Sequence, residues 1–170
     1  EHARNYLILE GRTPERIIKT GDILIIDTGA NYDGYFCDFD RNFSFGQPDK
    51  DTRHAYELVY QATNAGFEAA RPGATTTDLW GAMATVLDTG GGQRNSVGRM
   101  GHGLGMQLTE GPSVSPHDKT PLEVGMVLTL EPGMTTVKGK QMVHEENIVI
   151  TEGGAEYLSR RAPEELPIID

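Results

Sequence analysis

The chain has 170 residues, of which 37% are hydrophobic and 24% charged, the balance of a globular protein with one buried core. Its formal net charge of −10 argues against nucleic acid or an anionic membrane as the main partner. No apolar run approaches the roughly 20 residues that cross a bilayer. Cys37 is the single cysteine, which excludes an internal disulfide and fits a reducing compartment, so we expect a cytoplasmic protein.

The first third of the chain is predicted to be rich in β-strands. A short strand over residues 6–9 and a turn over 11–14 come first. An apolar strand then covers residues 23–27, and a return strand runs from about residue 34 to 45. Together the last two strands form an antiparallel hairpin.

The hairpin turn sets which residues face each other. We centre it on Tyr32 and Asp33, in a stretch where Asn, Asp and Gly gather. In this register Asp27 and Asp38 are direct cross-strand partners on one face. Like charges in that arrangement destabilise a sheet, so the pair predicts a cation between the two carboxylates.

Two helices are predicted in the middle of the chain. The first has about five turns and is capped by Asp51 or Thr52. The second is capped by Thr77 or Asp78 and stops at glycines 90–92. Both carry apolar residues at helical spacing, which we interpret as core packing.

The second half returns to strands. Glycines concentrated in residues 101–105 predict backbone packed close to a neighbour. A loop is expected over 112–121, an apolar strand over 126–131, and, after a hairpin turn at 139–140, a strand over 143–151. Because the helices are grouped between two strand-rich halves, the order predicts an α+β fold.

Further candidate residues accompany the two aspartates. His102 lies between glycines, which allow another group to approach it closely. Asp40 shares the face of Asp38 by period-two counting, but Arg41 follows it. We therefore interpret Asp40 as an ion-pair partner or an outer support rather than a direct ligand.

Three glutamates complete the candidate set. Glu131 ends one apolar strand, and Glu145 and Glu146 open another. An acid at the inner end of an apolar strand is costly unless it is paired or metal-bound. With one glutamate of the adjacent pair counted, four carboxylates and one imidazole form an oxygen-rich set suited to Mn²⁺, Fe²⁺, Co²⁺ or Zn²⁺, and bridging carboxylates can hold two such ions.

These residues, in this order, resemble the pita-bread metallopeptidases, a superfamily that includes methionine aminopeptidase, aminopeptidase P, prolidase and creatinase. The resemblance covers about residues 14–165 and is strongest to the Xaa-Pro peptidase branch. It is carried by the segments GDILIIDTGANYDGYFCDFDRNF, GHGLGMQLTEGPS, EVGMVLTLEPGM and VHEENIVITEGGAEYLS.

The resemblance implies a dinuclear metal centre. By position its ligands are Asp27, Asp38, His102, Glu131 and Glu145. Glu145 is preferred because it lies six residues before Thr151, as the last ligand of the family does, and Glu146 is the alternative. Two divalent ions are implied, Mn first and Co, Fe or Zn as alternatives.

The resemblance also implies a mechanism and an assembly. In the family, a hydroxide that bridges the metals attacks the scissile amide carbonyl, and a carboxylate at the position of Glu131 shuttles the proton. A homodimer is implied as well. Residues 1–170 are expected to form a single but incomplete catalytic domain, its C-terminal part, with the N-terminal portion missing.

The substrate side departs from the family pattern. A His-Glu pair usually follows the GHG motif, and here Thr109 stands in place of that catalytic histidine. A second histidine is expected near residues 9–11, where none occurs. His117 and His144 could replace a lost imidazole, although we expect both to be surface residues.

Three functions are therefore compared. The first is a metal-dependent hydrolase of the Xaa-Pro peptidase type that acts on a small peptide. The second uses the same metals on a small non-peptide molecule, as a dimethylsulfoniopropionate lyase or an ectoine hydrolase does, and Thr109 favours it. The third is a non-catalytic binding relative, which the five occupied ligand positions argue against.

Overall fold

The computed structural model describes residues 17–91, 93–94 and 98–170, and these form an α+β fold. The expected strand at 6–9, the turn at 11–14 and the position of the second histidine at 9–11 lie outside the described residues. The elements are β1 (Ile23–Tyr32), β2 (Tyr35–Phe45), α1 (Lys50–Ala69), α2 (Thr76–Thr89), β3 (Gln93–Arg94), β4 (His102–Gly103), β5 (Glu110–Ser113), β6 (Val127–Leu130), β7 (Gly133–Thr135), β8 (Gln141–Val143), β9 (Glu146–Thr151), β10 (Gly154–Tyr157) and β11 (Ile168–Ile169).

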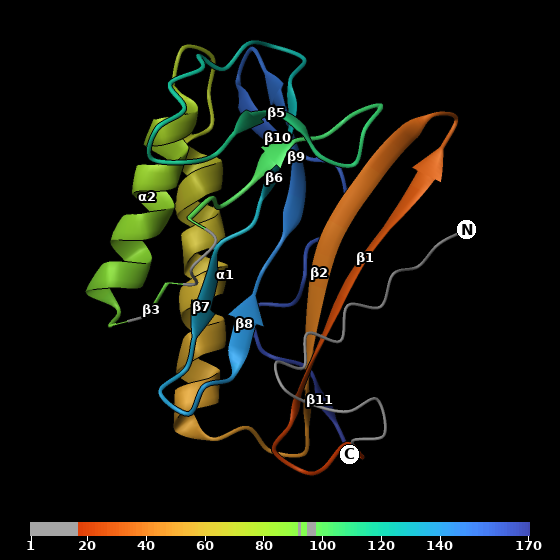
Figure 1. Ribbon diagram of the computed structural model, residues 1–170, viewed down its shortest axis with the longest axis vertical. Coiled ribbons are helices and arrows are strands. Elements are labelled where there is room, and N and C mark those ends of the chain that lie inside the picture. Colours follow the sequence, from red (N-terminus) through yellow and green to blue (C-terminus); the bar gives the residue numbers. More distant parts are fainter. Residues whose placement is uncertain (1–16, 92, 95–97) are drawn as a thin grey trace.

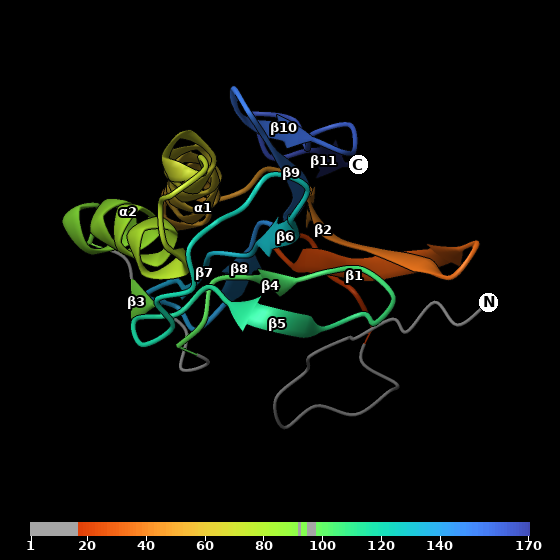
Figure 2. The same cartoon turned by 90° about the horizontal axis from the view of Figure 1, so that it is seen from above.

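The described strands form three sheets. The largest has the order β10-β9-β6-β4-β5, and two smaller ones have the orders β1-β2-β11 and β3-β7-β8. Both helices lie on one side of the central strands and the long β1–β2 hairpin lies on the other, as Figures 1 and 2 show from two directions. The hairpin and the large sheet meet where β2 runs beside β9.

The hairpin register differs from the expected one. The turn consists of Asp33 and Gly34, whose φ angles are 51° and 89°. A two-residue type I′ turn needs positive φ at both central positions, and Asp-Gly adopts this more readily than Tyr-Asp. The turn therefore sits one residue later, and Asp27 faces Asp40 while Asp38 faces Gly29.

This shift corrects the predicted pairing of Asp27 with Asp38. Because the shift moves partners by two residues, the side chains keep their faces. Asp27, Asp38 and Asp40 thus still share one face of the ribbon, with Asp38 diagonal to Asp27. The repulsion between like charges, from which we predicted a cation, therefore involves three carboxylates rather than two.

Each helix begins one to two residues before its expected cap. Asp49 caps α1 and accepts a hydrogen bond from the Thr52 N–H at 2.8 Å. Thr75 caps α2 in a reciprocal capping box with Asp78. None of the described helices is long and apolar enough to span a bilayer.

The apolar stripes of both helices form the core, as predicted. Leu79, Met83 and Leu87 of α2 are fully buried, and α1 contributes Val59 and others. At Gly66 a Cβ atom would lie 2.9 Å from the Met83 side chain, so this glycine allows α1 to approach α2 closely. Trp80 is partly buried against the same core.

Strands in the second half are shorter than expected. The predicted strand 126–131 ends at Leu130, and the predicted strand 143–151 is broken between β8 and β9. The expected loop 112–121 begins later, because β5 extends to Ser113. The two breaks lie side by side, since the His144 N–H donates to the Pro132 carbonyl at 3.2 Å. Glu131 and Glu145 occupy these breaks.

Candidate metal centre

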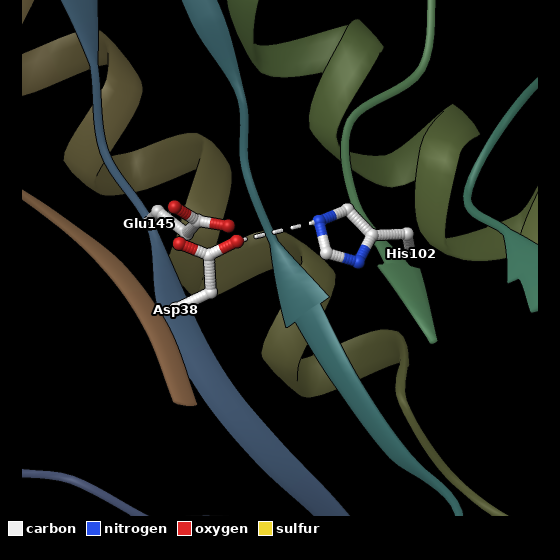
Figure 3. A group of neighbouring side chains, drawn as sticks. All are labelled: Asp38, His102 and Glu145. Carbon is white, nitrogen blue, oxygen red and sulfur yellow. Dashed lines mark ion pairs between the residues drawn. The ribbon is translucent and has the colours of Figure 1, made fainter. Parts of the chain in front are cut away.

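Five acidic and imidazole side chains converge where the hairpin meets the large sheet. Two groups have ligand atoms within 4.8 Å of one another: Asp38, His102 and Glu145 in the first, and Asp27, Asp40 and Glu145 in the second. Figure 3 shows the first group, with the Asp38 and Glu145 carboxylates side by side and the His102 ring directed at Asp38. Glu145 belongs to both groups and therefore links them.

His102 is held in one tautomer. Its Nδ1 lies 2.9 Å from the Gly103 carbonyl, which can only accept, so Nδ1 carries the proton. Burial lowers the pKa of His102, and the neutral ring presents the lone pair of Nε2. Nε2 lies 3.8 Å from Oδ2 of Asp38. Two lone-pair-bearing atoms face each other there without a proton between them, an arrangement that a cation would stabilise.

The glycine-rich segment lets His102 reach this position. A Cβ atom on Gly103 would clash with the Gly111 carbonyl of β5, and one on Gly101 would clash with the Thr129 carbonyl of β6. Gly101 also has φ +140°, which side chains rarely adopt. The predicted close backbone approach is thus confirmed. It allows β4 to lie between its neighbours β5 and β6.

Several carboxylate oxygens in the cluster are buried without a partner. Within the described residues, Oδ1 of Asp40, Oε2 of Glu131 and Oε1 of Glu145 have no hydrogen-bond donor. A buried carboxylate that nothing compensates is costly. Orphaned oxygens gathered around one imidazole are the donor set that a divalent cation would satisfy.

The pKa values of these carboxyls report the same shortage of positive charge. Burial, and then the charge of Asp27, raise the pKa of Asp38 to about 6. Burial and the neighbouring acids raise the pKa of Asp40 to about 9 and that of Glu145 well above its usual range. Burial alone raises the pKa of Asp27. The cluster is thus hard to ionise without cations.

Glu131 belongs to the same electrostatic cluster although it is in neither close group. Burial raises its pKa to about 7, Arg99 opposes this shift, and the charges of Asp38 and Asp27 add to it. Arg99 also lowers the pKa of Asp38. Arg99 is therefore a cation beside the cluster that offsets only part of its negative charge.

Glu146 is occupied elsewhere, which favours Glu145 as the ligand. The Glu146 carboxylate accepts from Nη2 of Arg41 at 3.2 Å and from the Ala162 N–H at 2.7 Å. Arg41 also donates to the main-chain carbonyls of Asp40 and Glu145. The expected ion pair of Arg41 with the Asp40 carboxylate is therefore not formed, because the guanidinium pairs with Glu146.

An asparagine joins the two strands that lie beside the acidic cluster. The Asp38 N–H donates to Oδ1 of Asn147 at 3.0 Å, and the Asn147 amide donates back to the Asp38 carbonyl. This pair connects β2 to β9 next to Glu145. The hairpin is thereby fixed against the sheet at the point where the two sets of acids meet.

The substrate-side candidates do not belong to either of the two close groups. Thr109 is exposed, one residue before Glu110, which pairs with Gly103 across β4 and β5. His117 is exposed, as expected. The surface prediction was wrong for His144, which is fully buried and contacts Thr63 and Glu146. His144 therefore lies beside Glu146, the partner of Arg41, rather than beside the unpartnered carboxylates of the cluster.

The predicted hairpin register did not place Asp40 opposite Asp27. The signal that could have changed this is the Asp33-Gly34 dipeptide, which sets the register that places Asp40 opposite Asp27.

Comparison with known proteins identifies the family of the chain. Residues 2–152 match the model of metallopeptidase family M24, and the chain belongs to that family. It is 35% identical over 150 residues to an Xaa-Pro dipeptidase of Pyrococcus furiosus, across 88% of this chain and 43% of the relative. The chain thus spans less than half the length of such curated relatives.

Solved structures show the same fold. The dipeptidase PepE of Mycobacterium ulcerans superposes with a TM-score of 0.84 at 34% identity, over 90% of this chain and 41% of that one. A methionine aminopeptidase of Rickettsia prowazekii superposes with a TM-score of 0.76 at 25% identity, over 82% of this chain and 65% of that one. The expected pita-bread fold is confirmed, as is the relationship to Xaa-Pro peptidases.

Proposed function

We propose that this chain contributes the metal centre of a hydrolase of the Xaa-Pro peptidase type. The observation that carries the proposal is the pair of lone-pair-bearing atoms, Nε2 of His102 and Oδ2 of Asp38, that face each other at 3.8 Å beside unpartnered carboxylates. Two divalent ions, Mn²⁺ first and Co²⁺, Fe²⁺ or Zn²⁺ as alternatives, would be held by Asp27, Asp38, His102, Glu131 and Glu145.

When bound, such ions would activate water and polarise a substrate carbonyl. Glu131 is the group that would hold and move a proton. Burial raises the pKa of Glu131 to about 7 in the metal-free fold, which supports a role for its carboxylate in holding a proton near neutral pH.

The other residues orient the reacting groups. The hydrogen bond from His102 Nδ1 to the Gly103 carbonyl fixes the ring, and the Asn147 bridge fixes Asp38. Metal ligands that are held in place before the reaction lower its barrier, because the site needs little reorganisation. The Xaa-Pro dipeptidase and PepE relatives support a small peptide as substrate.

A small non-peptide substrate is the second candidate, and Thr109 is the observation that favours it. A neutral hydroxyl can donate one hydrogen bond, but it supplies no positive charge to a developing oxyanion. The exposed position of Thr109, beside the strand pair that carries His102, is where such a difference would act.

Metal analysis of the full-length protein tests the shared part of both candidates. We expect two Mn²⁺ ions per chain after reconstitution, and a large loss of binding in Asp38→Ala. Fewer than one ion per chain, with Asp38→Ala changing nothing, would refute the proposal.

Parallel assays on an Xaa-Pro dipeptide and a zwitterionic non-peptide substrate then separate the two reactions. Thr109→His should create or raise dipeptidase activity if this position selects the substrate. Sedimentation of the same preparation tests the homodimer that we propose with this function.

A further inference from the structure

Asp40 is the most completely buried carboxylate of the β1–β2 hairpin. The residue is 4% exposed, and it lies directly opposite Asp27 on the face that meets the large sheet. Oδ1 of Asp40 has no hydrogen-bond donor in the part of the chain that is described. A ligand atom of Asp40 lies within 4.8 Å of ligand atoms of both Asp27 and Glu145.

The nearest cation in sequence does not satisfy Asp40. Arg41 follows on the opposite face of β2, where it pairs with Glu146 and stacks on Phe39 at 4.7 Å. Its contact with Asp40 is a hydrogen bond of 2.7 Å to the main-chain carbonyl. The protein therefore supports the backbone of Asp40 and leaves its carboxylate turned toward two other acids.

Three carboxylates gathered in this way, two of them buried, repel one another unless a cation lies among them. We propose that Asp40 is a sixth metal ligand, which completes a three-carboxylate subsite with Asp27 and Glu145. Asp38, His102 and Glu145 form the neighbouring subsite. This inference rests on the proposed metal centre and extends its set of five ligands.

The two subsites are then chemically different. The subsite of Asp27, Asp40 and Glu145 offers oxygen atoms alone, whereas its neighbour includes an imidazole nitrogen. Oxygen-only sets suit hard ions such as Mn²⁺, and imidazole suits Zn²⁺ and other borderline ions. The protein therefore has one subsite that prefers Mn²⁺ and one that accepts Zn²⁺ more readily.

Calorimetric titration of the full-length, metal-free protein with Mn²⁺ tests this assignment. The wild type should show two binding events. In Asp40→Asn one of the two events should lose affinity by at least about tenfold, because even the loss of a residue that only supports a ligand costs about 10–100-fold, while the other event stays within about twofold. Electron paramagnetic resonance should then change from a coupled Mn²⁺ pair to an isolated ion.

Asp33→Asn is the matched control. It removes the same charge from the same hairpin, and Asn tolerates the positive φ of that turn position. Asp33 is exposed at the tip, so both binding events should be unchanged. Asp40→Thr, which also removes the carboxylate, should reproduce the Asp40→Asn result and serves if the Asn variant folds poorly.

The outcomes separate this inference from the proposed function. Two Mn²⁺ events of unchanged affinity in both Asp40 variants would overturn the sixth ligand and leave the metal centre standing. Equal weakening of both events would also overturn it, since that is a general effect of charge. A wild type that binds no Mn²⁺ would overturn both proposals.

Discussion

Glu145 and Glu146 are adjacent and both almost fully buried, yet their surroundings are opposite. Glu146 accepts hydrogen bonds from Arg41 and the Ala162 N–H, so its charge is compensated by the protein. Glu145 has an unpartnered oxygen and faces other acids. One acid therefore lies among protein donors that compensate its charge, whereas its neighbour lies at an incomplete site.

The two histidines have similar settings. Nδ1 of His102 is held by a carbonyl, so Nε2 must present a lone pair to Asp38. The Thr63 hydroxyl donates its one proton to the Val59 carbonyl at 3.0 Å, so it accepts from Nδ1 of His144, whose Nε2 presents a lone pair 3.7 Å from Glu146. A buried acid beside a histidine is thus not by itself a metal site; Glu146 differs from Asp38 because Arg41 and the Ala162 N–H already compensate its charge.

The largest stability effect is expected on the compensated side. Glu146→Ala removes the partner of Arg41 and the acceptor of the Ala162 N–H. Breaking a buried ion pair costs about 3–5 kcal/mol, which corresponds to a fall in Tm of roughly 10 °C for a chain of this size. Thermal unfolding of the metal-free protein measures it, and a change below about 2 °C would contradict the network.

Glu145→Gln is the matched change on the other side. It removes a charge that repels its neighbours, so the metal-free protein should keep or raise its Tm. Affinity for Mn²⁺ should fall by at least about 100-fold, because Glu145 joins both ligand groups and even supporting residues cost up to that much. Thermal unfolding with and without Mn²⁺ checks both effects; Mn²⁺ stabilisation equal to the wild type would exclude Glu145 as a ligand.

The acid cluster should also give the metal-free protein an unusual pH dependence. Carboxyls titrate near pH 4 in the unfolded chain, whereas Asp38, Glu131 and Asp40 have pKa values of about 6, 7 and 9 in the fold. Between these limits the folded state holds protons that the unfolded state has released. The contribution of these groups to the stability of the fold is therefore fully present below about pH 4 and is lost as the pH rises toward 9.

Ionising these neighbouring carboxyls in the fold costs free energy, so Tm should fall by at least several degrees between pH 5 and pH 9. Saturating Mn²⁺ should remove this loss, since it favours the ionised carboxylates. Melting curves at both pH values, with Mn²⁺ and with a chelator, test it. A metal-free protein that gains stability toward pH 9 would contradict the cluster.

Much of this arrangement could be predicted from local sequence. The apolar periodicity of both helices and the acids at strand ends follow from short-range patterns, which are reliable when they are strong. The pairing of Asp27 depended on the turn type, and a turn placed one residue early was enough to give it the wrong partner. The separate roles of Glu145 and Glu146 depend on Arg41, over a hundred positions away, and no local pattern contains that contact.

The smallest expected effect concerns the hydroxyl that supports His144. Thr63→Val keeps the side-chain shape but removes the hydrogen bond of 2.9 Å to Nδ1 of His144. A buried hydrogen bond of this kind contributes about 1 kcal/mol, so Tm should fall by about 2–4 °C. Because this histidine belongs to the compensated side, the affinity for Mn²⁺ should not change. If Thr63→Val weakened Mn²⁺ binding as Glu145→Gln does, the two sides of the β8–β9 break would act as one site, and the distinction between the neighbouring glutamates would fail.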